Sequence, residues 1–76
     1  PALRTLVTGA ANGIGAAIAD RLRQRGDTVI GLDREPGDGI ITADLADPAE
    51  RRRAVDAALE RLGDVDVLVC VAGVFR

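Results

Sequence analysis

A glycine-rich segment, Thr8-Gly9-Ala10-Ala11-Asn12-Gly13-Ile14-Gly15, stands between two different hydrophobic patterns. The short β-branched run before it, residues 3–8, predicts a buried strand, and residues 13–25 after it repeat with helical periodicity. Glycines at such a junction let the chain turn tightly and let the helix start close to the strand. The free N–H groups and positive dipole end of the helix can then face a phosphate. The segment therefore predicts a strand–turn–helix unit with an anion-binding turn.

The rest of the chain also contains short runs typical of strands and one segment typical of a helix. Residues 28–33, 40–43 and 66–71 are short apolar runs that predict three more strands. Asp47 is placed to cap a second helix that starts at Pro48 and ends before Gly63, with Glu50 positioned to complete a capping box. The expected inner faces of the two helices are Ile14, Ala17, Ile18, Ala19 and Leu22, and Ala54, Val55, Ala58, Leu59 and Leu62.

The strands are near-continuous apolar runs rather than alternating ones, which favours a parallel sheet covered on both faces. The predicted fold class is therefore α/β, an open parallel sheet of Rossmann type. The connection over residues 34–39 conflicts with this, because a parallel crossover normally needs a dozen or more residues. From local rules alone, a hairpin between the second and third strands competes with the parallel arrangement.

Composition excludes several classes of protein. The 76 residues allow one small domain, and the net charge of -2 offers no basic surface for nucleic acid or for a membrane. The apolar stretch over residues 67–74 is too short to span a bilayer. One cysteine permits no internal disulfide, and the lack of histidine excludes a Cys/His zinc site or a histidine-dependent triad. We expect a cytoplasmic protein whose lone Cys70 is a small core residue.

One carboxylate strengthens the interpretation of the glycine-rich segment. Asp33 ends the second predicted strand, close to the spacing of about 20 residues expected for a ribose-binding acid. It can accept hydrogen bonds from the ribose hydroxyls of NAD and would repel the 2′-phosphate of NADP. Arg34 argues the other way, since an inward-turned guanidinium could pair with that phosphate. A P-loop hydrolase is disfavoured, because no Gly-Lys-Ser/Thr follows and the chain has no lysine.

These residues resemble the short-chain dehydrogenase/reductase family, whose motif T-G-x-x-x-G-I-G is present over residues 8–15. The resemblance continues through Asp33, Asp44-Leu45 and Ala72-Gly73, and so covers nearly the whole chain. It implies strand order 3-2-1-4 with helices on both faces, and parallel second and third strands despite the short connection. The residues it would place around the pyrophosphate and adenosine ribose are Gly9, Asn12, Gly13, Ile14 and Gly15.

The resemblance also assigns the adenine end of the site. Asp44 would face the adenine amino group with Leu45 beside the ring, and Ala72 and Gly73 would let the backbone approach the cofactor. The chain departs from the family at Cys70-Val71, where an asparagine pair is usual, so the hydrogen bonds of that asparagine are missing.

The chain also lacks the family's catalytic side chains, since it contains neither tyrosine nor lysine. We therefore expect residues 1–76 to be the N-terminal, cofactor-binding part of a single dinucleotide-binding domain, with the catalytic half following it. The parent protein would be an NAD(H)-dependent oxidoreductase acting on a small alcohol or ketone, and a homo-oligomer. The alternative is a non-catalytic nucleotide-binding sensor or structural protein of the same fold.

Overall fold

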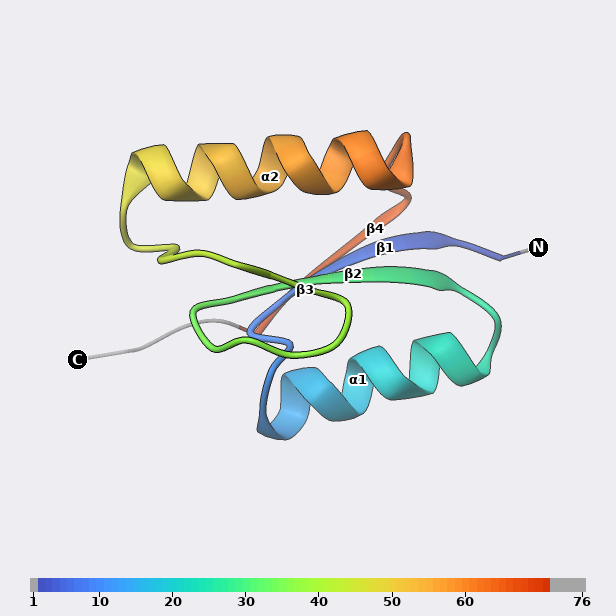
Figure 1. Cartoon of the computed structure of the whole chain (residues 1–76). Coiled ribbons are helices and arrows are strands. Elements are labelled where there is room, and N and C mark those ends of the chain that lie inside the picture. Colours follow the sequence, from blue (N-terminus) through green and yellow to red (C-terminus); the bar gives the residue numbers. More distant parts are fainter. Residues whose placement is uncertain (1, 72–76) are drawn as a thin grey trace.

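The computed structural model describes residues 2–71, and its six elements follow the predicted order (Figure 1). Their ends differ from the predicted ones by a residue or so, within the usual uncertainty of element boundaries. The elements are β1 (Arg4–Thr8), α1 (Gly13–Gln24), β2 (Thr28–Asp33), β3 (Ile40–Thr42), α2 (Pro48–Leu62) and β4 (Val67–Cys70).

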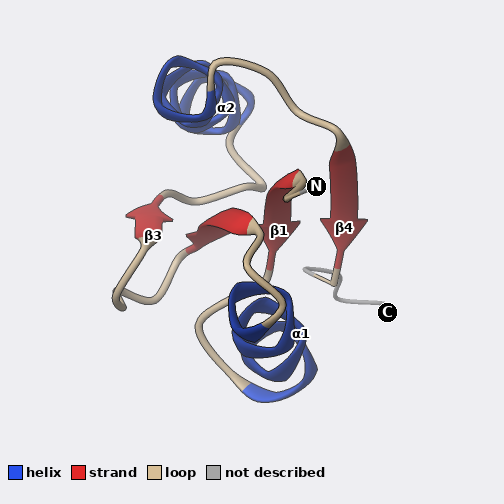
Figure 2. Ribbon diagram, turned by 90° about the vertical axis from the view of Figure 1, so that its right-hand side faces the viewer, coloured by secondary structure: helices blue, strands red, loops and turns tan. Residues whose placement is uncertain are grey.

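The four strands form one open sheet in the order β3-β2-β1-β4, and every neighbouring pair is parallel (Figure 2). This confirms the predicted Rossmann-type arrangement and excludes the hairpin between β2 and β3. Successive residues of a strand point to opposite faces, so Leu6 lies on one face and Val7 on the other. The connection reverses direction at β1, which is the switch point of the sheet.

The short connection between β2 and β3 is possible because the two strands overlap so little. Gly31 is level with Ile40 and Asp33 with Thr42, so β3 lies beside only the end of β2. The chain has to step back about 7 Å along β2, or two residues at about 3.3 Å each. Residues 34–39 have ample reach for that step. The Gly31 N–H donates to the Gly39 carbonyl at 2.8 Å, which fixes the end of the connection against β2.

The two helices cover opposite faces of the sheet (Figures 1 and 2). On the α2 face the core contains Leu6, Leu32, Ile41, Ala43, Ala54, Ala58 and Leu62. On the α1 face it contains Val7, Ala10, Ala19 and Val29. The small side chains of Ala19, Ala54 and Ala58 are almost completely buried, which lets each helix pack close to the strands.

Four side chains that the sequence analysis placed in the core are exposed. Ile14 is 72% exposed, Leu59 is 40% exposed, and Ala17 and Cys70 are also exposed. Leu68 of the fourth strand is 58% exposed as well. Leu68 and Cys70 lie on β4, an outer strand of this sheet, and α2 packs over β1, β2 and β3 instead. Ile14 lies in the first turn of α1.

The predicted cap of α2 forms, but the reciprocal bond of the capping box does not. The Asp47 carboxylate accepts the N–H groups of Ala49 and Glu50. The Glu50 side chain instead pairs with Arg53, and the Asp47 N–H donates to the Asp44 carbonyl. An available arginine one turn along the helix therefore competes successfully for the glutamate.

Candidate dinucleotide-binding site

The glycine turn, residues 9–15, leaves the carboxyl end of β1 at the centre of the sheet and leads into α1. In open parallel sheets the crevice for a ligand lies at this edge, beside the strand where the connections reverse direction. The Gly9 N–H donates to the Leu32 carbonyl at 2.8 Å, so the turn starts out attached to β2. The next residue of the turn, Ala10, is buried in the core on the α1 face, so its position is fixed as well.

Gly15 is required by the packing of the turn on itself. A Cβ at this position would lie 1.8 Å from the Gly9 carbonyl oxygen and 2.6 Å from its carbonyl carbon. Both atoms belong to the backbone, so no side-chain rotation can relieve the contact. Gly31 in the middle of β2 has a related role, since a Cβ there would lie 2.6 Å from the Ala10 Cβ. The sequence analysis missed Gly31, although a glycine inside an apolar strand is a recognised sign of close approach.

Gly13 differs from Gly15 because open space faces it. Its φ of +58° lies in the left-handed region that side chains disfavour, and none of residues 2–71 has an atom within 4 Å of a Cβ built there. Gly13 and the neighbouring Asn12 are both exposed. The turn therefore presents bare backbone to an open volume at the first residue of α1.

The amino ends of the two helices differ in a way that favours an anion at α1. Asp47 caps α2, whereas Asn12 occupies the N-cap position of α1 and makes no side-chain cap bond. The first turn of α1 also holds no acidic residue. The N–H groups at the start of α1 are therefore not compensated by a carboxylate from the N-cap or the first turn of the helix, which suits a phosphate.

Asp33 lies at the carboxyl end of β2, next to the glycine turn. Its Oδ2 accepts the Ala11 N–H at 3.0 Å, and its Oδ1 accepts the Glu35 N–H at 3.0 Å. Partial burial by itself raises the pKa of Asp33, but the N–H groups of Glu35, Ala11 and Arg34 and the charge of Arg34 together hold the pKa below its ordinary value. Asp33 is therefore a carboxylate at neutral pH. The neighbouring Arg34 is exposed.

Asp44 and Leu45 follow β3 at the same edge of the sheet. The Ala43 N–H donates to the Asp33 carbonyl at 2.8 Å, which brings the start of this segment beside the end of β2. Asp44 is exposed and accepts the Ala46 N–H at 3.0 Å, while Leu45 is half-buried against the core on the α2 face. The two other predicted residues, Ala72 and Gly73, lie outside the described residues.

Other kinds of site are not supported within residues 2–71. No three acidic, cysteine or histidine side chains in this range are grouped so that they could hold a metal ion. Neither of the helices in this range is long and apolar enough to cross a membrane.

The fold is an open parallel sheet of Rossmann type, and the comparisons with known proteins identify its family. Residues 4–76 match the short chain dehydrogenase family. The chain is 41% identical over 85 residues to 1-deoxy-11-beta-hydroxypentalenate dehydrogenase of Streptomyces avermitilis, an alignment that covers 91% of this chain and 31% of that protein. The chain belongs to the short-chain dehydrogenase family.

Two solved structures share the fold closely. The 3-alpha-hydroxysteroid dehydrogenase of Pseudomonas sp. B-0831, solved in complex with NADH, is 50% identical with a TM-score of 0.83, over 93% of this chain and 31% of that one. The ligand-free aldohexose dehydrogenase of Thermoplasma acidophilum is 33% identical with a TM-score of 0.85, over 99% of this chain and 31% of that one. The present chain spans about a third of the length of the relatives it matches.

Proposed function

We propose that this chain is the cofactor-binding, N-terminal part of a longer NAD(H)-dependent dehydrogenase that interconverts an alcohol and a ketone. The observation that carries the proposal is the Asp33 carboxylate, which lies beside an anion-ready glycine turn at the carboxyl edge of a parallel sheet. Family membership and a relative solved with NADH support the same conclusion.

The residues present fit a dinucleotide. Gly13 leaves room for a pyrophosphate in front of the first turn of α1, where Asn12 makes no cap bond. In this proposal the exposed Ile14 covers part of the bound cofactor, and Asp44 and Leu45 form the adenine end. Bound NAD would supply a hydride acceptor, and NADH a hydride donor. The chain's own contribution is to bind and orient that group.

The preference for NAD over NADP follows from charge. A 2′-phosphate would have to approach the Asp33 carboxylate, and like charges in contact are strongly unfavourable. Fluorescence titration of the full-length protein should give at least about tenfold tighter binding of NADH than of NADPH. Equal or tighter NADPH binding would overturn the preference. Arg34→Ala is the matched variant, because a loss of NADPH affinity there would mean that the guanidinium engages the phosphate.

Catalysis requires side chains that this chain lacks. Reduction of a ketone needs a proton donor near the carbonyl oxygen, and no tyrosine or lysine occurs among the 76 residues. We therefore expect the full-length protein to oxidise an alcohol with NAD while residues 1–76 alone give no turnover. We also propose that the parent enzyme is cytoplasmic and homo-oligomeric.

A non-catalytic nucleotide-binding protein of the same fold is the alternative, and the exposed Cys70 in place of the usual asparagine is the feature that favours it. The full-length sequence separates the two functions. A downstream serine followed by Tyr-x-x-x-Lys supports the enzyme, and their absence supports the alternative.

A further inference from the structure

The glycine turn is attached to β2 at two successive places. A backbone bond joins the Gly9 N–H to the Leu32 carbonyl, and a side-chain bond joins the Ala11 N–H to Asp33. The second bond acts at the residue just before Asn12 and Gly13, where the backbone turns left-handed and α1 begins. Without the Asp33 bond, only the backbone bond at Gly9 would hold the turn to β2, and the exposed part of the turn would have no bond of its own to that strand.

The other oxygen of Asp33 bonds to a second segment, the start of the connection between β2 and β3. It accepts the Glu35 N–H at the start of the connection to β3, so one carboxylate spans the glycine turn and that connection. Both bonds are to a charged acceptor, which makes them stronger than bonds between neutral groups.

We propose that Asp33 is a positioning residue for the phosphate-binding turn in addition to being the ribose-binding acid. This inference rests on the proposed function. In this role the carboxylate holds the N–H groups of Ala11 and Glu35 in place before the cofactor arrives, so binding loses less conformational entropy. Removing the carboxylate must then weaken cofactor binding by more than the loss of the ribose contact alone would.

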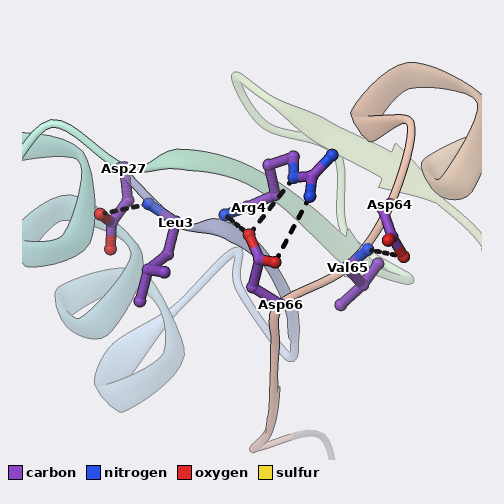
Figure 3. Close-up of polar contacts among 6 residues, drawn as sticks. All are labelled: Leu3, Arg4, Asp27, Asp64, Val65 and Asp66. Atoms are coloured by element: carbon purple, nitrogen blue, oxygen red, sulfur yellow. Dashed lines mark hydrogen bonds and ion pairs between the residues drawn. The ribbon is translucent and has the colours of Figure 1, made fainter. Parts of the chain in front are cut away.

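Two aspartates at the amino ends of the strands make comparable contacts, and one of them, Asp66, provides a control. Asp66 accepts the Arg4 N–H at 2.8 Å, and Asp27 accepts the Leu3 N–H at 3.1 Å (Figure 3). Each links segments distant in sequence, as Asp33 does, but at the amino ends of the strands. Asp66→Asn should therefore weaken the fold without changing the glycine turn.

The test separates positioning from ribose recognition with an NAD analogue whose adenosine ribose lacks both hydroxyls. Asp33→Ala, Asp33→Asn and Asp66→Asn are made in the full-length protein. If Asp33 positions the turn, Asp33→Ala binds the analogue about tenfold more weakly than the wild type does. Asp33→Asn keeps one acceptor oxygen, so its affinity for the analogue should lie between those of Asp33→Ala and the wild type. Asp66→Asn should bind the analogue like the wild type.

Amide hydrogen exchange in the cofactor-free protein gives a second, independent measurement. The Ala11 and Glu35 amides should exchange at least about tenfold faster in Asp33→Ala and at the wild-type rate in Asp66→Asn. Unchanged analogue affinity, or unchanged exchange at Ala11, would overturn the positioning role while NAD binding by the wild type stands. Faster exchange in a protein that binds no dinucleotide would overturn the proposed function, and the positioning role with it. The isosteric Asp33→Asn covers the case in which Asp33→Ala does not fold.

Discussion

Replacing Gly15 by alanine should damage the packing of the turn more than the same replacement of Gly13. The new Cβ would lie 1.8 Å from the Gly9 carbonyl oxygen, whereas nonbonded carbon and oxygen atoms prefer about 3.5 Å. The two backbone segments must therefore separate by more than about 1 Å. Because Gly9 is bonded to Leu32 and Gly15 is buried at the start of α1, that movement has to distort the turn itself.

The size of the effect follows from this contact. Overpacking a core typically destabilises a protein by about 1–3 kcal/mol, and a clash between backbone atoms belongs at the upper end. For a parent protein of the relatives' size, about 3 kcal/mol lowers the melting temperature by about 6–12 °C. A displacement of about 1 Å among binding groups can also cost about 100-fold in kcat/KM.

Gly26→Ala is the matched control. Gly26 follows α1 with a φ of +100°, and no atom of the described residues lies within 4 Å of a Cβ built there, so only the backbone strain of about 1–2 kcal/mol applies. Calorimetry and NADH titration of the full-length variants make the comparison. Gly15→Ala with wild-type NADH affinity, or with a melting temperature as high as that of Gly26→Ala, would refute the packing argument.

Three further changes test other parts of the structure. Gly13→Val should abolish NADH binding in a titration yet leave the circular dichroism spectrum recognisable, because the side chain enters the open space before α1 and is strained at φ +58°; unchanged affinity would mean that the phosphate lies elsewhere. Thr5→Val should raise stability by about 1–2 kcal/mol in chemical denaturation, since the buried Thr5 hydroxyl has no hydrogen-bond partner among residues 2–71, and the reverse change Val7→Thr on the same sheet face should lower it similarly; a destabilising Thr5→Val contradicts this reasoning. Finally, the hydrogen bond from Arg25 holds the pKa of Asp27 below its ordinary value of about 3.9, so its stabilisation is complete above that value and is lost as the pH falls through the lowered pKa. Asp27→Asn should flatten this acid dependence in melts below about pH 5, and an identical pH profile would count against it.

The sequence predicted the element order because each signal is local. The glycine turn, the proline and aspartate that start α2 and the glycine that ends it act within a few residues of themselves. The near-continuous apolar strands likewise indicated a sheet covered on both faces, and the structure confirms both the parallel strands and the helix on each face. For the candidate site, local rules found the glycine turn and Asp33, and the family resemblance added Asp44 and Leu45.

Local rules could not decide the direction of β3, because that depends on how far β3 overlaps β2 rather than on the residues between them. They also treated the apolar side of each helix as core. The exposure of Ile14 and Leu59 depends on where the helix lies over a sheet of limited width.

Tertiary structure alone separated the roles of residues that look alike in the sequence. Gly15 is required because another part of the backbone approaches it, and Gly13 because its backbone is left-handed and faces open space. The bond between Asp33 and the Ala11 N–H joins residues on different elements. A periodic pattern specifies which face a residue prefers, but close approach and hydrogen-bond partners exist only once distant segments have packed together.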